Sequence, residues 1–207
     1  MTNNYAKIVQ GNLDRLYDNL PEDLAKNLPA EQDGERYIFT AFGEKCTIEP
    51  KRITLGQKES ASILGILLSL YVLNTCPDVC IPLPLKSFKE FPDSMPYAGA
   101  FTTHTEQPLV PYVAKVKEAA QKISSSFHGE KAPPETGGDF SFIVYPLPKI
   151  ALCYIFYEAD DDFPASVTCL FSNNANQFMP IDGLADVGEY TSKKILGVIL
   201  TQAETKT

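Results

Sequence analysis

Apolar residues recur with a helical spacing in several parts of the chain. Residues 4–20 carry them three or four positions apart, which predicts an amphipathic helix. A short second helix follows, with Pro21 at its first position, where a missing N–H costs little. Residues 57–73 are apolar on nearly every side, which predicts a central helix enclosed by the rest of the protein. Residues 110–127 again have one apolar face, so we expect a third helix there.

Strand-like alternation of apolar and polar residues occurs in two regions. Residues 36–42 and 45–49 alternate on either side of Gly43-Glu44, which predicts a β-hairpin preceded by a polar turn over residues 29–35. The second region predicts an antiparallel meander of three strands, over residues 139–145, 150–158 and 165–171.

The order of these elements favours an α+β fold with a mostly antiparallel sheet. After the meander, Asp182 is placed to cap a final helix that reaches about residue 200. Helices and strands come in runs and do not alternate strictly, which is typical of α+β proteins. We therefore expect an N-terminal hairpin and a C-terminal three-strand meander, packed with helices that include the buried central one.

The whole chain, residues 1–207, is predicted to be a single domain, because its length is within the range of one large domain. Residues 124–138, rich in Ser, Pro and Gly, indicate a flexible loop, and residues 201–207 a frayed tail. Six prolines between residues 81 and 112 predict an irregular but packed connection. The same segment is rich in aromatic residues, and such a long connection usually covers a core or lines a site.

Charge and cysteine content narrow the classes of function. The net charge is −8, which opposes binding to the phosphates of nucleic acids and to anionic lipids. No basic segment followed by an apolar core opens the sequence, so we expect no signal peptide. The apolar run over residues 63–73 is far shorter than the ~20 residues that span a bilayer. The five cysteines are odd in number and irregularly spaced, which argues against a disulfide framework and favours a cytoplasmic protein.

Turn and aliphatic residues of the C-terminal part follow the pattern P-x3-L-x7-D-x2-F-P and continue beyond it. The residues concerned are Pro148, Leu152, Asp160, Phe163, Pro164, Leu170-Phe171, Pro180, Gly183-Leu184-Ala185 and Gly188, with Leu68, Tyr71-Val72-Leu73 and Ser87-Phe88 upstream. In these residues the chain resembles an uncharacterised domain-of-unknown-function family (number 3786). The resemblance covers about residues 13–196, and members of the family are typically found in anaerobic bacteria and archaea.

The family has no established reaction or catalytic residues, so the resemblance assigns no site. Fusions of some members to a small iron–sulfur domain, of the kind seen in corrinoid proteins, imply a setting in anaerobic redox or one-carbon metabolism. The four closely spaced cysteines of such a cluster do not occur in this sequence. The resemblance therefore implies a small-molecule cofactor, or a redox or corrinoid protein, as the partner of a non-catalytic binding protein, with the oligomeric state open.

The proline-rich aromatic segment is the predicted place of a ligand site. Pockets are mostly apolar with a few polar groups, and this segment supplies both kinds of side chain. We expect Phe88, Tyr97, Phe101 and His104 to contact the ligand against the sheet. Asn173, in an amide-rich turn after the last strand, is a further candidate, because amide side chains clamp polar ligands. Turn amides also serve simply to satisfy nearby backbone groups.

His104 leaves two kinds of chemistry open. As an axial ligand it would hold a haem or a corrinoid, which makes these the cofactors to consider. As a general base it would belong to an enzyme, with Glu106 and the acidic turn of Asp160, Asp161 and Asp162 as its partners. A lone histidine in a loop is more often a surface or capping group, and acidic residues are common in turns between strands. The sequence therefore identifies no catalytic residue.

Metal and redox chemistry have weaker signals. With only His104 and His128, a zinc site of three histidines is impossible, and we expect no metal site. Cys76 and Cys80 form a C-x3-C pair on a loop, which is either a metal or redox pair or incidental. A third alternative is a structural or assembly protein, which an exposed apolar patch of several hundred Å² without a pocket would favour.

Overall fold

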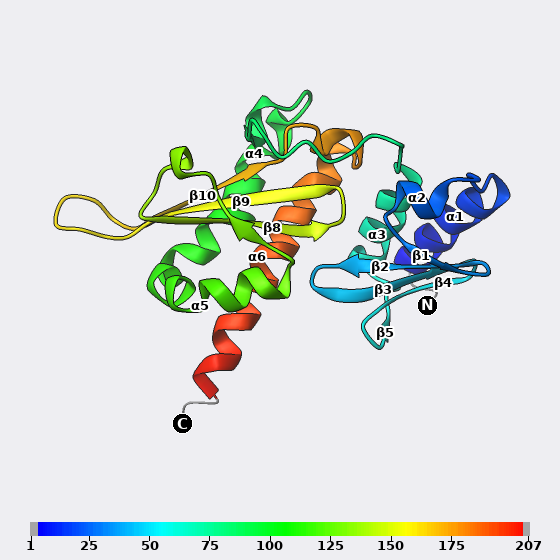
Figure 1. Cartoon of the computed structure of the whole chain (residues 1–207), viewed down its shortest axis with the longest axis horizontal. Coiled ribbons are helices and arrows are strands. Elements are labelled where there is room, and N and C mark those ends of the chain that lie inside the picture. The colour runs from blue at the N-terminus through cyan, green and yellow to red at the C-terminus, as the bar shows by residue number, and fades with distance from the viewer. Residues whose placement is uncertain (1–3, 205–207) are drawn as a thin grey trace.

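The computed structural model describes residues 4–204, and their side chains as far as residue 201. It contains two five-stranded sheets, in the strand orders β1-β2-β3-β4-β5 and β6-β10-β9-β8-β7. All neighbouring strands are antiparallel, so the predicted α+β class with a mostly antiparallel sheet is confirmed. The sheets lie side by side in two lobes, each with its own helices (Figure 1).

The N-terminal lobe packs three helices against the first sheet. The helices are α1 (Asn4–Asp18), α2 (Leu24–Asn27) and α3 (Ile63–Leu73). The strands are β1 (Glu31–Asp33), β2 (Arg36–Ala41), β3 (Glu44–Glu49), β4 (Arg52–Leu55) and β5 (Lys58–Glu59). The predicted hairpin is correct, but it is only the middle of a longer meander.

Three predictions for this lobe are wrong in their limits. Helix α2 begins at Leu24 and not at Pro21. The polar turn over residues 29–35 contains strand β1, which pairs with β2. The central helix begins at Ile63 and not at residue 57, because Gly56, with φ +59°, turns the chain so that β5 pairs with β4. An apolar run fixes a buried helix well, but the polar residues before it carry no helical period, so pairing with a neighbouring strand decides their structure.

The C-terminal lobe holds the predicted meander at the centre of its sheet. Strands β8 (Phe140–Leu147), β9 (Ile150–Tyr157) and β10 (Ser166–Phe171) pair in sequence, and the two-residue strands β6 (Lys86–Ser87) and β7 (Glu130–Lys131) lie at the edges. Strand β7 lies inside the predicted loop over residues 124–138. All four edge strands of the two sheets are short and carry charged residues, a composition that discourages pairing with other chains.

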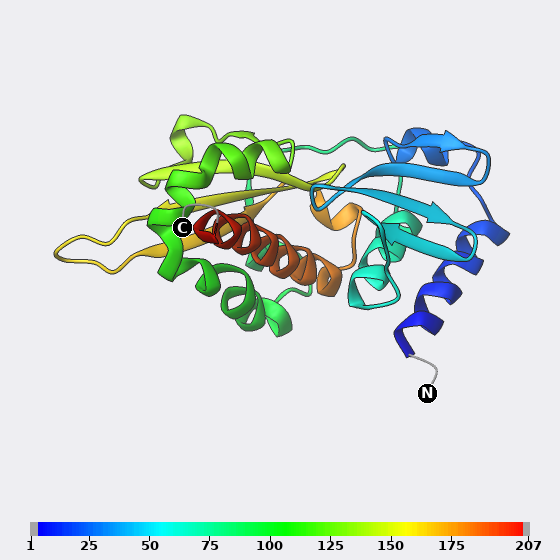
Figure 2. The ribbon, with the colours of Figure 1, turned by 90° about the horizontal axis from the view of Figure 1, so that it is seen from below.

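Three helices cover one face of this sheet: α4 (Met95–Phe101), α5 (Val113–Ser126) and α6 (Ile181–Glu204) (Figure 2). The predicted irregular connection is largely helical, since α4 continues through a π-helical turn (Thr102–Glu106) and a 3-10 turn (Gln107–Tyr112) into α5. Pro96 and Pro108 lie in the first turns of α4 and the 3-10 turn, where proline is tolerated. Helix α6 includes residues 201–204 of the predicted frayed tail, and residues 205–207 lie outside the described part.

One continuous cluster of buried residues joins the two lobes. At the junction the rings of Phe42 and Tyr190 are 5.9 Å apart, and the backbone N–H of Lys149 donates to Tyr71 Oη over 3.1 Å. Lys194 of α6 is ion-paired with Glu44 of the other lobe. Within the part of the chain that the structure describes, no helix is both long and apolar enough to cross a membrane.

Candidate functional site

The segment predicted to line a ligand site forms two separate hollows around its π-helical turn. π-Helical turns are rare in proteins, and those that do occur are often found at functional sites. Phe101 lies between the hollows and borders both of them. The predicted residues are therefore divided: Tyr97 and His104 face one hollow, and Phe88 faces the other.

The hollow beside His104 is small and acidic. Its volume is about 150 Å³, and Asp182, Asp186 and Glu189 of α6 line it opposite Tyr97 and His104. Pockets for drug-sized ligands occupy ~300–1,000 Å³, so this hollow holds a small group and is too small for a haem or a corrinoid. His104 is exposed and sits in the π-helical turn, where a loop is predicted.

Asp186 in this hollow makes stability depend on pH. Burial, and then the charges of Glu189 and Asp182, raise the pKa of Asp186, while Lys193 lowers it. Because the folded-state pKa is above the ordinary value of ~3.9, the folded state holds the proton more tightly, and this contribution to stability is lost as pH rises through the folded pKa. We predict that Asp186→Asn raises the melting temperature at neutral pH, and that the gain disappears below about pH 4. A control at exposed Asp161 should show no such gain, and equal gains at both pH values would contradict the account.

The hollow beside Phe88 is bordered by an aromatic core. Its volume is about 350 Å³, and Lys89 and Glu106 lie on its wall. The rings of Phe88 and Phe101 stack at 4.5 Å, and both pack against Phe171. Phe88 and Phe101 are each only 3% exposed, so their first role is to fill the core between α4 and the sheet.

Asn173 lies apart from the other predicted residues. Its Nδ2 donates to the carbonyl of Pro84 over 3.0 Å, and its backbone N–H donates to Ile81. The neighbouring Asn174 is buried, accepts from the backbone N–H of Ile81 and donates to Val79. This amide turn fastens the extended segment that crosses the second face of the sheet, and the two amides are occupied with backbone groups.

The acid–base alternative has its residues in different places. Glu106 accepts the backbone N–H of Cys169 over 3.0 Å and faces the Phe88 hollow, whereas His104 faces the other one. Asp160 accepts two N–H groups of its own turn, at the far end of the β9–β10 hairpin (Figure 1). Neither hollow is lined by Asp160, Asp161 or Asp162. This alternative stays a prediction.

All five cysteines are free thiols. Burial raises the pKa of Cys46 and Cys169 and raises that of Cys153 to about 12, so these three act as small core residues. Cys80 is half-buried, and burial raises the pKa of its thiol as well. Among residues 4–201 no group of three or more His, Cys, Asp or Glu side chains is arranged to hold a metal ion.

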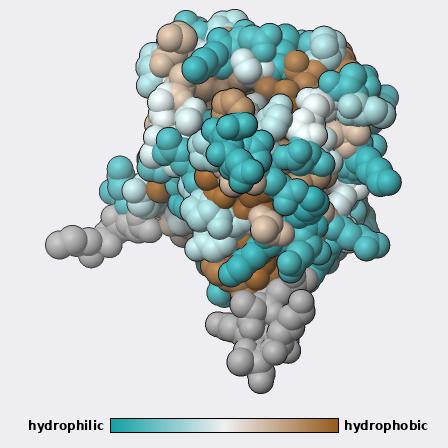
Figure 3. Space-filling model, turned by 90° about the vertical axis from the view of Figure 1, so that its left-hand side faces the viewer, coloured by the Kyte–Doolittle hydropathy of each residue, from teal (hydrophilic) through white to brown (hydrophobic). Residues whose placement is uncertain are grey.

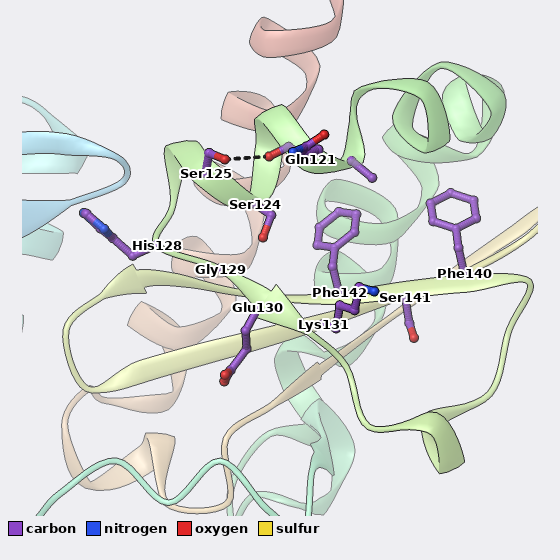
Figure 4. Close-up of a pocket in the computed structure, with 11 residues that line it drawn as sticks. Gln121, Ser124, Ser125, His128, Gly129, Glu130, Lys131, Phe140, Ser141 and Phe142 are labelled. Atoms are coloured by element: carbon purple, nitrogen blue, oxygen red, sulfur yellow. Dashed lines mark hydrogen bonds between the residues drawn. The ribbon is translucent and has the colours of Figure 1, made fainter.

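A larger groove lies between α5 and strands β7 and β8 (Figure 4). We call it the α5–β8 groove, and its volume is about 500 Å³. Phe140 and Phe142 rise from β8 toward the helix, and Ser124 points down from α5 between helix and strands (Figure 4). The remaining lining residues are Ala120, Gln121 and Ser125 of α5, His128 and Gly129 of the following turn, Glu130 and Lys131 of β7, and Ser141 of β8.

The two walls of this groove, helix α5 and strand β8, are each held in place by packing. Helix α5 is anchored through its buried residues Val113, Val116, Ala119 and Ile123. On the same face of the sheet, the rings of Phe140 and Phe156 stack at 4.6 Å, and Phe142 packs at 5.4 Å from the ring of Phe156. At the end of α5, Gly129 passes so close to β8 that a Cβ there would lie 2.4 Å from the carbonyl oxygen of Ile143.

Charge is distributed unevenly along β7. Glu130 points to the other face of the sheet (Figure 4) and accepts a hydrogen bond of 2.6 Å from Tyr145 Oη. Burial, followed by this hydrogen bond and the charge of Glu130, raises the pKa of Tyr145. Lys131 lies on the groove side near Phe142, so the charged group next to the apolar floor is a cation (Figure 4).

The sequence interpretation missed this groove for a definite reason. Its helix and its strand were both predicted, but the turn and β7 between them lie in the segment interpreted as a flexible loop. The available signal was the position of Phe140 and Phe142 on one face of a strand with a helix end just before it. On the face that Figure 3 shows, apolar groups lie among polar ones.

Comparison with known proteins gives one result. A search of curated proteins and a search of solved structures each gave no match. A family model described as "Domain of unknown function (DUF3786)" matches residues 20–194, which is well over half of the chain. The chain therefore belongs to this family of domains of unknown function.

Proposed function

We propose that the protein is a non-catalytic binding protein, and that it holds a small molecule with an apolar body in the α5–β8 groove. The observation that carries the proposal is the combination of size and lining. At about 500 Å³ the groove has the volume of a small-molecule site, and it has a floor of Phe140 and Phe142 with Ser124 and Gln121 above them. Apolar area supplies affinity in such sites, and the few polar groups fix orientation.

The setting of this function is also a proposal. The free thiols support a reducing compartment such as the cytoplasm. Membership of the family supports the setting that its resemblance implies, which is anaerobic redox or one-carbon metabolism with a redox or corrinoid protein as partner. The polar side chains of the groove are hydroxyls, an amide, one histidine and one lysine, with the carboxylate of Glu130 turned away. This set supports binding more than acid–base catalysis.

The neutral fluorescent probe N-phenyl-1-naphthylamine tests the groove, because it has a purely apolar ring system. We expect the wild-type chain to bind it with enhanced fluorescence. Ala120→Phe, which places a ring in the groove, should weaken binding at least about tenfold, whereas Ala114→Phe on an exposed part of the same helix should not. Equal affinities of the two variants, or no binding to the wild type, would overturn the proposal.

A further inference from the structure

We infer that the natural ligand of the α5–β8 groove is an organic anion: an apolar or aromatic body that carries a carboxylate or a similar acidic group, paired with Lys131. This inference rests on the proposed function, since it names the class of ligand for the same groove. It concerns a cation beside an apolar floor, in a chain whose net charge is −8.

The charge of Lys131 is unpaired within the part of the chain that the structure describes. None of the ion pairs there includes it, and its side chain has no hydrogen bond to another described residue. Its neighbour Glu130 is turned to the opposite face and bonded to Tyr145. In an acidic protein, a lysine left without a carboxylate beside an apolar floor is complementary to an acidic ligand.

The carboxylates near the other end of the groove are already occupied. Glu158 is ion-paired with Lys117, and Asp139 Oδ2 accepts the backbone N–H of Glu158 over 2.6 Å. The ammonium of Lys117 lies 5.9 Å from the centre of the Phe140 ring, so a cation also lies near this end. The charge of Glu158 is therefore compensated, and Glu130, the carboxylate that lines the groove, points to the other face of the sheet.

The arrangement also defines how such a ligand would lie. Phe140 and Phe142 are two residues apart on β8 and rise from the same face (Figure 4), and both rings pack against Phe156. Lys131 pairs with Phe142 across the β7–β8 ladder, so its ammonium is next to the floor and toward the edge of the sheet. An acid whose apolar body covers the two rings would thus place its charged group at the solvent-facing edge, where Lys131 can donate to it.

Two probes that differ in one charged group separate this inference from the proposed function. 8-Anilinonaphthalene-1-sulfonate carries a sulfonate on the ring system of neutral N-phenyl-1-naphthylamine. We expect Lys131→Met to weaken binding of the sulfonate probe about tenfold, with little change for the neutral probe, because only the first needs the cation. Lys122→Met, an exposed lysine of α5 outside the groove, should change neither affinity. Added salt should weaken the binding of the sulfonate probe and leave the binding of the neutral probe unchanged.

The two probes distinguish a failure of the anionic ligand class from a failure of the groove itself. Selective loss of the sulfonate probe in Lys131→Met supports the anionic ligand. Equal affinities of Lys131→Met and wild type for that probe, or an equal loss for both probes, would overturn the anionic class while the groove itself stands. If the wild-type protein binds the neutral probe but not the sulfonate probe, the ligand is not an organic anion. If wild type binds neither probe, the proposed function fails. Because Lys131 is exposed, the variant should keep the wild-type melting temperature, which verifies its fold.

Discussion

Replacing Gly65 by alanine should destabilise the protein by about 3 kcal/mol, at the upper end of the range for overpacking a core. Gly65 is buried in helix α3, and an ideal Cβ at this position would lie 1.8 Å from the carbonyl oxygen of Ser60. That oxygen belongs to the backbone, so neither atom can turn aside by a rotamer change. The helix has to move away from the chain segment that leads into it.

Thermal unfolding would show this as a fall of roughly 6–12 °C in melting temperature for a chain of this size. Gly11→Ala is the matched control, since Gly11 lies in helix α1 with nothing within 4 Å of an added Cβ. There alanine should stabilise by about 0.5–1 kcal/mol through its better helix propensity. If both substitutions changed the free energy of unfolding in the same direction, the close approach of α3 to Ser60 would be wrong.

Phe101→Ala is expected to have an effect of similar size, about 3–5 kcal/mol, because it removes a buried ring and leaves a cavity. The ring of Phe101 stacks on Phe88 and packs at 5.5 Å from the ring of Phe171. A methyl group added at Gly188 of α6 would lie 2.6 Å from the same ring, which shows how closely the helix covers it. Chemical denaturation measures the free energy of unfolding directly.

Tyr97→Ala tests the same segment at an exposed position. Tyr97 lies in helix α4 with 38% of its surface exposed. Its truncation should therefore lower the free energy of unfolding much less than Phe101→Ala does. A small loss for Phe101→Ala, comparable to that of Tyr97→Ala, would show that the aromatic segment does not form the core between α4 and the sheet.

Much of the fold could be predicted from periodicity alone. Strands β8, β9 and β10 and the long helix α6 have strong patterns that run for many residues, and the structure places each of them where it was expected. Strands of two or three residues, such as β1, β5 and β7, are too short to show alternation. Their structure follows from pairing with a neighbour, which the sequence does not show locally.

The site was harder to predict, because its parts are brought together only by tertiary packing. Phe88 and His104 belong to one aromatic segment, yet they line different hollows. Asn173 carries the expected amide, but a backbone carbonyl 89 residues away occupies it. The α5–β8 groove depends on the gap between a helix and a strand edge. The spacing of Phe140 and Phe142 indicates an apolar strand face, but not the width of that gap.

The measurement that tests the central claim most directly is an NMR titration of the backbone amides with N-phenyl-1-naphthylamine. The groove predicts that shift changes concentrate in residues 120–131 and 140–142, with residues 97–104 unchanged. Changes concentrated around Tyr97, Phe101 and His104 would instead place the ligand in the segment that the sequence favours, and would contradict the assignment of the α5–β8 groove.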